Sequence, residues 1–372
     1  MSDAAADDPG RPAVAPPDPL RVLVIPDYGA HNPYQRLLAD ALARHGVTAV
    51  GGRPGRRRPF PILAAWRRAG RPPVVHLHWT HEYLKGRGPG PSRLARLRLA
   101  VQLGMLRRRG VRVIWTIHNI AGHDRPRDAA EMAAQRATLR AVDGAIAHCA
   151  AARAAAIAAW GLSPDEAARI AVIPHGSYAG VHPPGPGRAA ARTRLGLPAD
   201  GPVLLFLGVV RPYKGIEALV TALAALPDPE LRLVIAGELK DAALAASLAA
   251  AAAADPRIIL RPGYVPDADV GLLMDAADLV TLPFRDILTS GSAILALTFG
   301  RPVVAPARGC LPETIPPAAG VLYDPDVPGA LAAAIAAALA GDRAAGEAAA
   351  RAAADALAWD PIAARTAALY RG

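Results

Sequence analysis

Short apolar runs alternate along the chain with longer segments of helical spacing. Residues 203–207 (Val-Leu-Leu-Phe-Leu) have the length and composition of a buried strand, and residues 215–225 repeat apolar positions at helical intervals. Regular alternation of this kind predicts parallel sheets covered by helices on both faces. The strands expected are 21–25, 47–50, 74–79, 111–116, 144–148 and 170–173 in the first half, and 203–207, 231–236, 257–260, 278–282 and 302–305 in the second.

A proline- and glycine-rich stretch separates the two alternating halves. Residues 183–187 read Pro-Pro-Gly-Pro-Gly, which is typical of a linker. The pattern predicts an α/β protein with two Rossmann-like, doubly wound parallel-sheet domains, residues 20–182 and 188–350, and a ligand site in the cleft between them. Residues 1–19 are rich in Pro, Ala and Asp, so we expect a disordered tail rather than a signal peptide.

Charge and cysteine content narrow the possible partners and the compartment. The net charge is +10, which favours anionic partners such as phosphorylated small molecules, a membrane surface or nucleic acid. Cys149 and Cys310 are far apart and lack metal-type spacing, so we expect reduced thiols in a cytoplasmic protein. No window has the length and apolar character of a transmembrane helix.

The turn at 208–215 (Gly-Val-Val-Arg-Pro-Tyr-Lys-Gly) is the strongest candidate for ligand binding. It joins a buried strand to a helix, and its glycines let a ligand approach the backbone. Arg211 and Lys214 supply two cations, and lysine is rare here, at positions 85, 214 and 240. This combination is typical of a diphosphate site. An ordinary strand–helix loop with solvated charges is the alternative interpretation.

Two common nucleotide-binding motifs are absent from the sequence. No G-x-G-x-x-G opens the helix after the first strand, and no G-x-x-x-x-G-K-[ST] occurs, which disfavours a nicotinamide dehydrogenase and a P-loop enzyme. The D-x-D at Asp267 and Asp269 is interpreted as a helix start. We therefore expect neither a metal nor a cofactor, with the diphosphate neutralised by cations and a helix N-terminus.

Several blocks in a fixed order carry a family resemblance. They are the 208–215 turn, Ile235-Ala236-Gly237, Gly263-Tyr264-Val265-Pro266 and residues 299–305 (Phe-Gly-Arg-Pro-Val-Val-Ala). Over essentially the whole chain after residue 20, the sequence resembles the GT-B glycosyltransferases of the family 4-like group. The resemblance implies a bacterial enzyme that moves a hexose from a UDP- or GDP-linked sugar to a lipid-linked or saccharide acceptor, in surface polysaccharide or glycolipid synthesis.

The resemblance also implies a division of labour between the halves. The donor would bind the second domain and the acceptor the first, and the last helix, 351–372, would return toward the first domain. Gly208 would contact the diphosphate with Arg211 and Lys214, and the loop holding Tyr264 and Val265 would contact the base.

One departure from the family pattern affects the expected chemistry. The two glutamates usual before the 299–305 block are replaced by Ile287 and Leu295. Asp286, one residue from the first of these positions, is the candidate to replace that glutamate, and Glu217 and Glu238 are candidates for a ribose contact. Since the family's glutamate pair is typical of retaining members, its loss leaves inversion of the anomeric carbon open. A second anion-binding site is expected at a helix start that carries hydroxyls and a glycine, namely Thr289, Ser290, Gly291 and Ser292. The alternative interpretation is that Ser290 is only an N-cap.

Polar side chains follow several strands of the first half. Asp27 and His31 follow the first strand, His76 and His78 lie on or after the third, and His118 and Asn119 follow the fourth. An inverting enzyme needs a general base on this side. Related enzymes with a T-x-H-[DN] block place the histidine near the sugar, so His118 is expected to contact the donor sugar. Packing roles remain an alternative for each histidine.

Two arginine-rich segments belong to the first half. Residues 53–73 and 91–112 each hold seven arginines and no acid, and Phe60, Ile62, Leu63 and Trp66 are interleaved in the first. These segments predict peripheral binding to the anionic inner face of the plasma membrane, unless they form a solvated face in an arginine-rich chain. Nucleic-acid binding is disfavoured because no recognition module appears. An inactive homologue that serves as a binding partner and a nucleotide-sugar epimerase remain alternatives.

Overall fold

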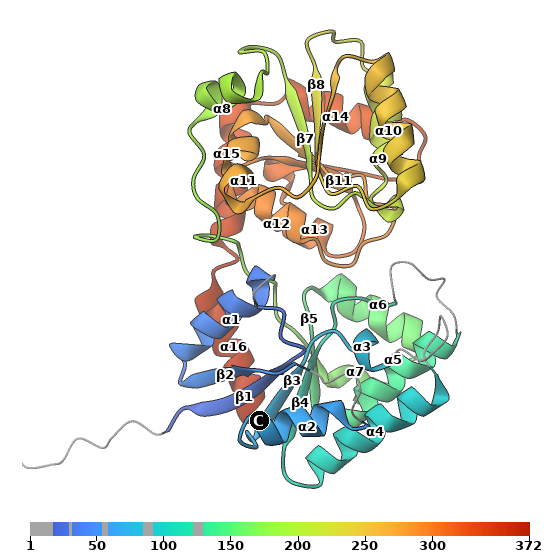
Figure 1. Cartoon of the computed structure of the whole chain (residues 1–372), viewed down its shortest axis with the longest axis vertical. Helices are drawn as coiled ribbons and strands as arrows, with labels where there is room; N and C mark the ends of the chain where they lie inside the picture. Colours follow the sequence, from blue (N-terminus) through green and yellow to red (C-terminus); the bar gives the residue numbers. More distant parts are fainter. Residues whose placement is uncertain (1–17, 30–31, 54–58, 85–91, 122–128) are drawn as a thin grey trace, which may run out of the picture.

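The computed structural model describes residues 18–29, 32–53, 59–84, 92–121 and 129–372. They form two parallel α/β domains, one above the other in Figure 1. The two Rossmann-like domains predicted from the alternation are confirmed. Residues 1–17 of the expected tail lie outside this part of the chain, as do His31 and the arginines at 56–58.

The first sheet has six strands in the order β2-β1-β3-β4-β5-β6. Its central strands are buried on both faces, as the apolar runs predicted. Its helices cover both faces, and α2 and α4 lie side by side on one of them (Figure 1). The strands are β1 (Leu20–Ile25), β2 (Val47–Gly51), β3 (Val74–Leu77), β4 (Arg112–Thr116), β5 (Gly144–Ala147) and β6 (Ile170–Val172), and the helices are α1 (Pro33–Ala43), α2 (Pro61–Arg68), α3 (His81–Leu84), α4 (Arg93–Arg107), α5 (Ala129–Ala141), α6 (Ala150–Trp160) and α7 (Pro164–Ala168).

The second sheet has the order β12-β11-β10-β7-β8-β9. All its strands are parallel, and the order of strand addition reverses between β7 and β10, because β8 and β9 lie on one side of β7 and β10 to β12 on the other. Ligands of doubly wound sheets bind beyond the carboxyl ends of the strands at such a reversal. The strands are β7 (Val203–Leu207), β8 (Arg232–Gly237), β9 (Ile258–Pro262), β10 (Leu279–Thr281), β11 (Val303–Pro306) and β12 (Gly320–Tyr323). The helices are α8 (Arg188–Leu195), η1 (Pro212–Lys214), α9 (Ile216–Ala224), α10 (Ala242–Ala254), α11 (Asp267–Ala276), α12 (Gly291–Thr298), α13 (Leu311–Thr314), η2 (Pro317–Ala319), α14 (Ala330–Ala340) and α15 (Arg343–Asp355).

The last helix, α16 (Trp359–Arg371), packs on the first domain beside α1 (Figure 1). Its Ile362, Ala363 and Ala367 side chains are part of that domain's core. Ala350 and Ala354 of α15 are instead buried in the second domain. The chain therefore crosses back at 356–358, and the returning helix begins at Trp359 rather than at residue 351.

The two polypeptide crossings between the domains form one paired hinge. The backbone N–H of Ser177, on the first crossing, donates to the Leu357 carbonyl on the second at 2.9 Å. The Trp359 indole N–H donates to the Ser177 carbonyl at 2.7 Å. These hydrogen bonds hold the two chain segments of the hinge together.

The cysteines also connect the domains, which corrects a prediction. Cys149, between β5 and α6, is disulfide-bonded to Cys310, just before α13. The expectation of reduced thiols is wrong because the fold brings together residues 161 positions apart, a proximity that no spacing rule reveals. Among the described residues, no helix is both long and apolar enough to cross a bilayer.

Candidate active site

Two glycine turns form the floor of the site in the second domain. Gly208 follows β7 and Gly237 ends β8, both at positive φ (136° and 146°). A Cβ on Gly237 would lie 1.9 Å from the Gly208 carbonyl oxygen. Both φ values favour glycine, and at Gly237 the neighbouring backbone also leaves no room for a Cβ.

A cavity of about 570 Å³ opens above these turns and is lined by both domains. It takes in most of the residues predicted to bind the donor. From the second domain it is lined by Gly208, Gly237, Glu238, Tyr264, Val265, Gly291 and Ser292. Gly29, Asn32 and Arg36 of the first domain, with Tyr178 and His182 of the hinge segment, line the other side.

Arg211 is the N-cap of the short η1 helix after Gly208, and Lys214 is the last residue of that helix. The Lys214 Nζ atom sits 4.4 Å from the centre of the Phe284 ring, a cation–π contact. Burial and the neighbouring Arg211 guanidinium lower the pKa of Lys214 to about 8. Among the described residues neither cation belongs to the cavity lining, so the pair forms a basic element beside the glycine turn rather than the cavity wall.

The N-terminus of α12 faces the same cavity. The Ser290 hydroxyl accepts from the Ala293 N–H at 3.1 Å, so Ser290 is an N-cap and is buried. Gly291 and Ser292 line the cavity, and a Cβ on Gly291 would lie 2.7 Å from the Tyr178 hydroxyl. The backbone N–H groups of this turn are available to an anion, while the Ser290 side chain is committed to the cap.

Three acids proposed as substitutes for the family glutamates differ in their surroundings. Glu238 lines the cavity and pairs with Lys240 at 2.9 Å. Glu217 pairs with Arg285 at 2.8 Å. Asp286 is exposed and does not line the cavity within the described residues. Glu238 is thus the acid best placed for a donor contact.

A cluster of histidines occupies the carboxyl ends of the first sheet. The His78 Nδ1 atom is 3.1 Å from His118 Nε2, and the His118 ring stacks on Trp79 with a centroid distance of 4.4 Å. His148 lies 5.5 Å from His118 and 5.4 Å from His175, measured between ring centres. His118 is half-buried, whereas the other histidines of the cluster (His76, His78, His148 and His175) are buried.

Hydrogen bonds to backbone fix the tautomers of two of these rings. The Nδ1–H of His148 donates to the Ile173 carbonyl at 3.1 Å, and that of His175 donates to the Gly176 carbonyl at 2.8 Å. Each neutral ring therefore carries its lone pair on Nε2. Within the described part of the chain, His148 Nε2 has no hydrogen-bond partner.

Burial keeps the whole cluster neutral. It lowers the pKa of His76 to about 3, of His148 to about 4 and of His175 to about 3. The pKa values of His78 and His118 are also well below the usual range, because burial and neighbouring imidazoles both disfavour a charge. Neutral imidazoles present ring lone pairs that can accept hydrogen bonds from hydroxyl groups.

The remaining acceptor-side candidates lie around this cluster. The Asp27 carboxylate accepts from the Gly29 N–H at 2.9 Å, and Gly29 lines the cavity. Asn119 is half-buried next to His118. His31 falls outside the described residues, so its prediction stays open.

Sequence reasoning missed several members of the site. His148 ends an apolar strand and was interpreted as part of it, although its place at a strand terminus was a usable signal. Tyr34 contacts His78, His118, His148 and His175 edge-on or tilted, with ring centres 4.6–5.8 Å apart. Its helical spacing on α1 indicates only a core residue. Trp359 reaches the site from the far end of the chain, which no local pattern reveals.

Comparison with known proteins identifies the class of enzyme. A GDP-mannose:glycolipid 4-beta-D-mannosyltransferase of Xanthomonas campestris pv. campestris is 31% identical over 262 residues, which are 69% of each chain. The family model described as glycosyl transferases group 1 matches residues 187–356. The chain is a group 1 glycosyltransferase.

Other similarities agree with this assignment. A D-inositol 3-phosphate glycosyltransferase of Kineococcus radiotolerans is 32% identical over 203 residues, which are 52% of this chain and 46% of that protein. The structure of sucrose-phosphate synthase from Thermosynechococcus elongatus superposes with a TM-score of 0.71 at 22% identity, covering 94% of this chain and 98% of that one. The GT-B fold and the glycosyltransferase activity expected from the sequence are both confirmed.

Proposed function

We propose that this glycosyltransferase moves mannose from GDP-mannose to a lipid-linked saccharide, with inversion at the anomeric carbon. The name of the Xanthomonas relative supports both the donor and a β product. GDP-mannose carries an α-linked mannose, so a β product requires inversion. The apolar Ile287 and Leu295, in place of the glutamate pair typical of retaining members, agree with this outcome.

The observation that carries the proposal is the cavity between the domains, which the Gly208 and Gly237 turns and the N-terminus of α12 line from the second domain. Arg211 and Lys214 lie beside the glycine turn, and within the described residues the histidine cluster is not part of the lining. The diphosphate lies on the Gly208 turn and the amides of α12, with Arg211 and Lys214 beside it. Cations and oriented N–H groups stabilise the charge that develops on the leaving nucleotide. This arrangement provides that stabilisation without a metal ion.

A single displacement accounts for the chemistry. The acceptor hydroxyl oxygen bonds to the anomeric carbon while the bond from that carbon to the phosphate oxygen breaks. The hydroxyl proton passes to a general base of the first domain, and GDP leaves with the bonding electrons. His118, the least buried ring of the cluster, contacts the sugar.

The surface of α4 supports a lipid-linked acceptor. Leu94, Leu97 and Val101 lie three and four residues apart and are 74%, 61% and 37% exposed. Exposed arginines flank them, namely Arg93, Arg107, Arg108 and Arg109 on and after α4, with Arg67 and Arg68 on α2. Ile62, Leu63 and Trp66, expected on this surface, are buried in the core instead, so of the four apolar residues predicted there only Phe60 is exposed.

An apolar stripe among arginines suits an anionic bilayer, where the side chains enter the interface and the guanidinium groups meet lipid phosphates. We place the enzyme at the inner face of the plasma membrane, whose lipids are anionic. Nucleic acid is not part of the proposed function.

The decisive experiment is transfer with defined donors. The purified enzyme is incubated with lipid extract and either GDP-mannose or UDP-glucose, and the anomeric configuration of the product is read by NMR. We expect a β-mannoside from GDP-mannose and little product from UDP-glucose. An α-linked product would refute inversion, and preference for a UDP-sugar would refute the proposed donor.

A further inference from the structure

The Cys149–Cys310 bond is a third connection between the domains, separate from the paired hinge. Both cysteines are buried, at 4% and 2% exposure, and their Cα atoms are 5.6 Å apart. The chain contains two cysteines in all, so neither has another partner within the molecule. A hinge alone permits rotation between two domains, whereas a hinge and a separate covalent tie restrict it.

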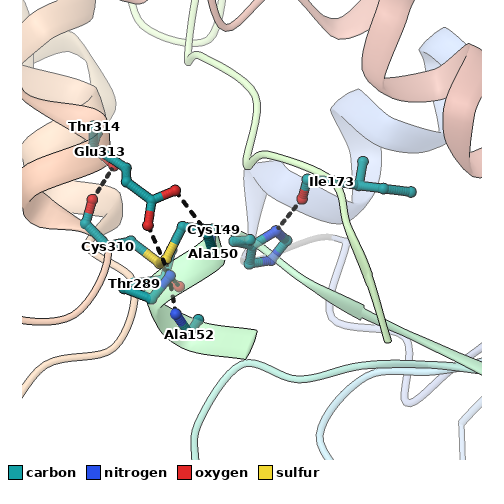
Figure 2. The surroundings of a disulfide bond; sticks show 10 residues. Cys149, Ala150, Ala152, Ile173, Thr289, Cys310, Glu313 and Thr314 are labelled. Atoms are coloured by element: carbon teal, nitrogen blue, oxygen red, sulfur yellow. Dashed lines mark hydrogen bonds between the residues drawn. A yellow bond between two sulfur atoms is a disulfide. The ribbon is translucent and has the colours of Figure 1, made fainter. Parts of the chain in front are cut away.

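The surroundings of the bond hold the two domains in register. The Glu313 carboxylate of the second domain accepts from the N–H groups of Ala150 and Ala151 at 2.9 and 2.7 Å (Figure 2). These amides form the N-terminus of α6 in the first domain, where a carboxylate is favoured. The Cys149 sulfur itself accepts from the Ala152 N–H at 3.1 Å and so caps the same helix.

The second-domain residues around Cys310 also pack against the first domain. Leu288 and Cys310 pack into the core of the first domain, and the Cys310 N–H donates to the Leu288 carbonyl at 2.7 Å. Gly309 has φ 56°, and a Cβ there would lie 2.5 Å from the Ile287 carbonyl oxygen. Glycine therefore lets this loop close tightly enough to present Cys310 to the other domain.

Each half of the bond adjoins one half of the site. Cys149 directly follows His148 of the histidine cluster. The Cys310 sulfur lies 3.6 Å from the hydroxyl of Thr289, next to the Ser290 cap of α12. The bond thus links the residue after the histidine cluster to the loop that precedes α12.

We propose that Cys149 and Cys310 form a reversible redox clamp that controls opening of the cleft. In the disulfide state the two domains stay at their present spacing. A dithiol reductant attacks one sulfur and forms a mixed disulfide, and its second thiol then displaces the protein thiol. Two electrons and two protons pass to the protein, which gains two thiols, while the reductant becomes a disulfide. The separated domains can then open for donor entry and nucleotide release.

The test compares oxidised and reduced wild-type enzyme, so it needs no variant that might fail to fold. The bond is formed with oxidised glutathione, broken with dithiothreitol and identified by peptide mass mapping. We expect a larger radius of gyration for the reduced form by small-angle scattering, and turnover lower by about fivefold or more for the oxidised form, at the lower end of couplings between sites.

Cys149→Ser supplies a matched variant, because serine keeps the cap on α6 but cannot cross-link. Its radius of gyration and turnover are expected to match those of the reduced wild type and to be unchanged by oxidised glutathione. Failure of the bond to form under glutathione disulfide, or its formation without change in scattering or turnover, would overturn the proposal.

The redox clamp rests on the proposed interdomain site, but failure of the clamp and failure of the proposed function give different experimental results. Bond formation and scattering are measured without substrate. If the proposed donor is wrong, GDP-mannose gives no product in either redox state while the scattering difference persists.

Discussion

The two halves of the proposed site offer a ligand different groups. The second domain offers backbone turns and a helix N-terminus that line the cavity, with the cations Arg211 and Lys214 beside them, and these groups suit a diphosphate. The first domain uses neutral aromatic and imidazole side chains gathered at the ends of four strands. One half is thus suited to stabilise the charge of the leaving group and the other to contact the hydroxyl groups of a sugar, so changes in each half should have separable effects.

The largest expected effect comes from the cation pair. Lys214→Ala removes a charge beside the diphosphate, so kcat/KM for transfer should fall by about 1,000-fold. Arg343→Ala is a control, because Arg343 lines a separate hollow beside Pro202 and Asp278, which precede β7 and β10. Equal losses in the two variants would show that the first loss reflects instability.

A change in the first half should reduce transfer but not nucleotide affinity. His118→Ala removes the proposed sugar contact, and transfer should fall by about 100-fold with the Kd for GDP nearly unchanged. His45→Ala, in an exposed pair with Asp360, serves as the control. If the Kd for GDP weakened as much as transfer, the assignment of the halves would be wrong.

Acid should destabilise the first domain through its histidines. In the unfolded chain they bind protons below about pH 6.5, whereas the folded pKa of His148 is about 4. The free energy of unfolding is therefore highest above pH 6.5 and falls as the pH drops toward the folded value.

His148→Asn removes one titrating ring and keeps a donor for the Ile173 carbonyl. Between about pH 7 and about pH 5, its free energy of unfolding in urea should drop by about 2 kcal/mol less than that of the wild type, roughly 30-fold in the equilibrium constant. Parallel pH curves for the two proteins would contradict the neutral assignment.

Alkali should act on the second half instead. The free enzyme holds Lys214 charged below about pH 8 and neutral above it. Raising the pH from about 7 to about 9 should weaken GDP binding by up to about tenfold by calorimetry. Lys214→Arg keeps its charge and should show little change over this range; a similar decline in that variant would assign the effect to another group.

The smallest effect concerns the outer face of the first domain. Leu97→Ser should lower binding to vesicles that contain phosphatidylglycerol by about fivefold, since half-burial of a leucine contributes about 1 kcal/mol. Val327→Ser, at a 52% exposed valine of the second domain, is the control. Binding that is independent of anionic lipid, or unchanged by Leu97→Ser, would remove the membrane surface from the proposal.

Much of the second half of the site could be predicted from the sequence because its motifs are local. Gly208, Gly291 and Ser292 were all selected from short segments, and all line the same cavity. A turn after a buried strand and a capped helix start are each encoded within a few residues. The first half could be predicted only in part, because a histidine at the end of one strand does not indicate which other strands lie next to it in the sheet.

The sequence by itself determined the two α/β domains, the glycine turn at 208–215 and the family, since periodicity and motif spacing are properties of the chain. The tertiary structure alone decided that Cys149 meets Cys310, that Trp359 and Tyr34 join five histidines, and that Ile62 and Trp66 are buried while Leu97 faces solvent. Contacts between residues distant in sequence depend on strand order and domain placement. Local pattern constrains neither of these.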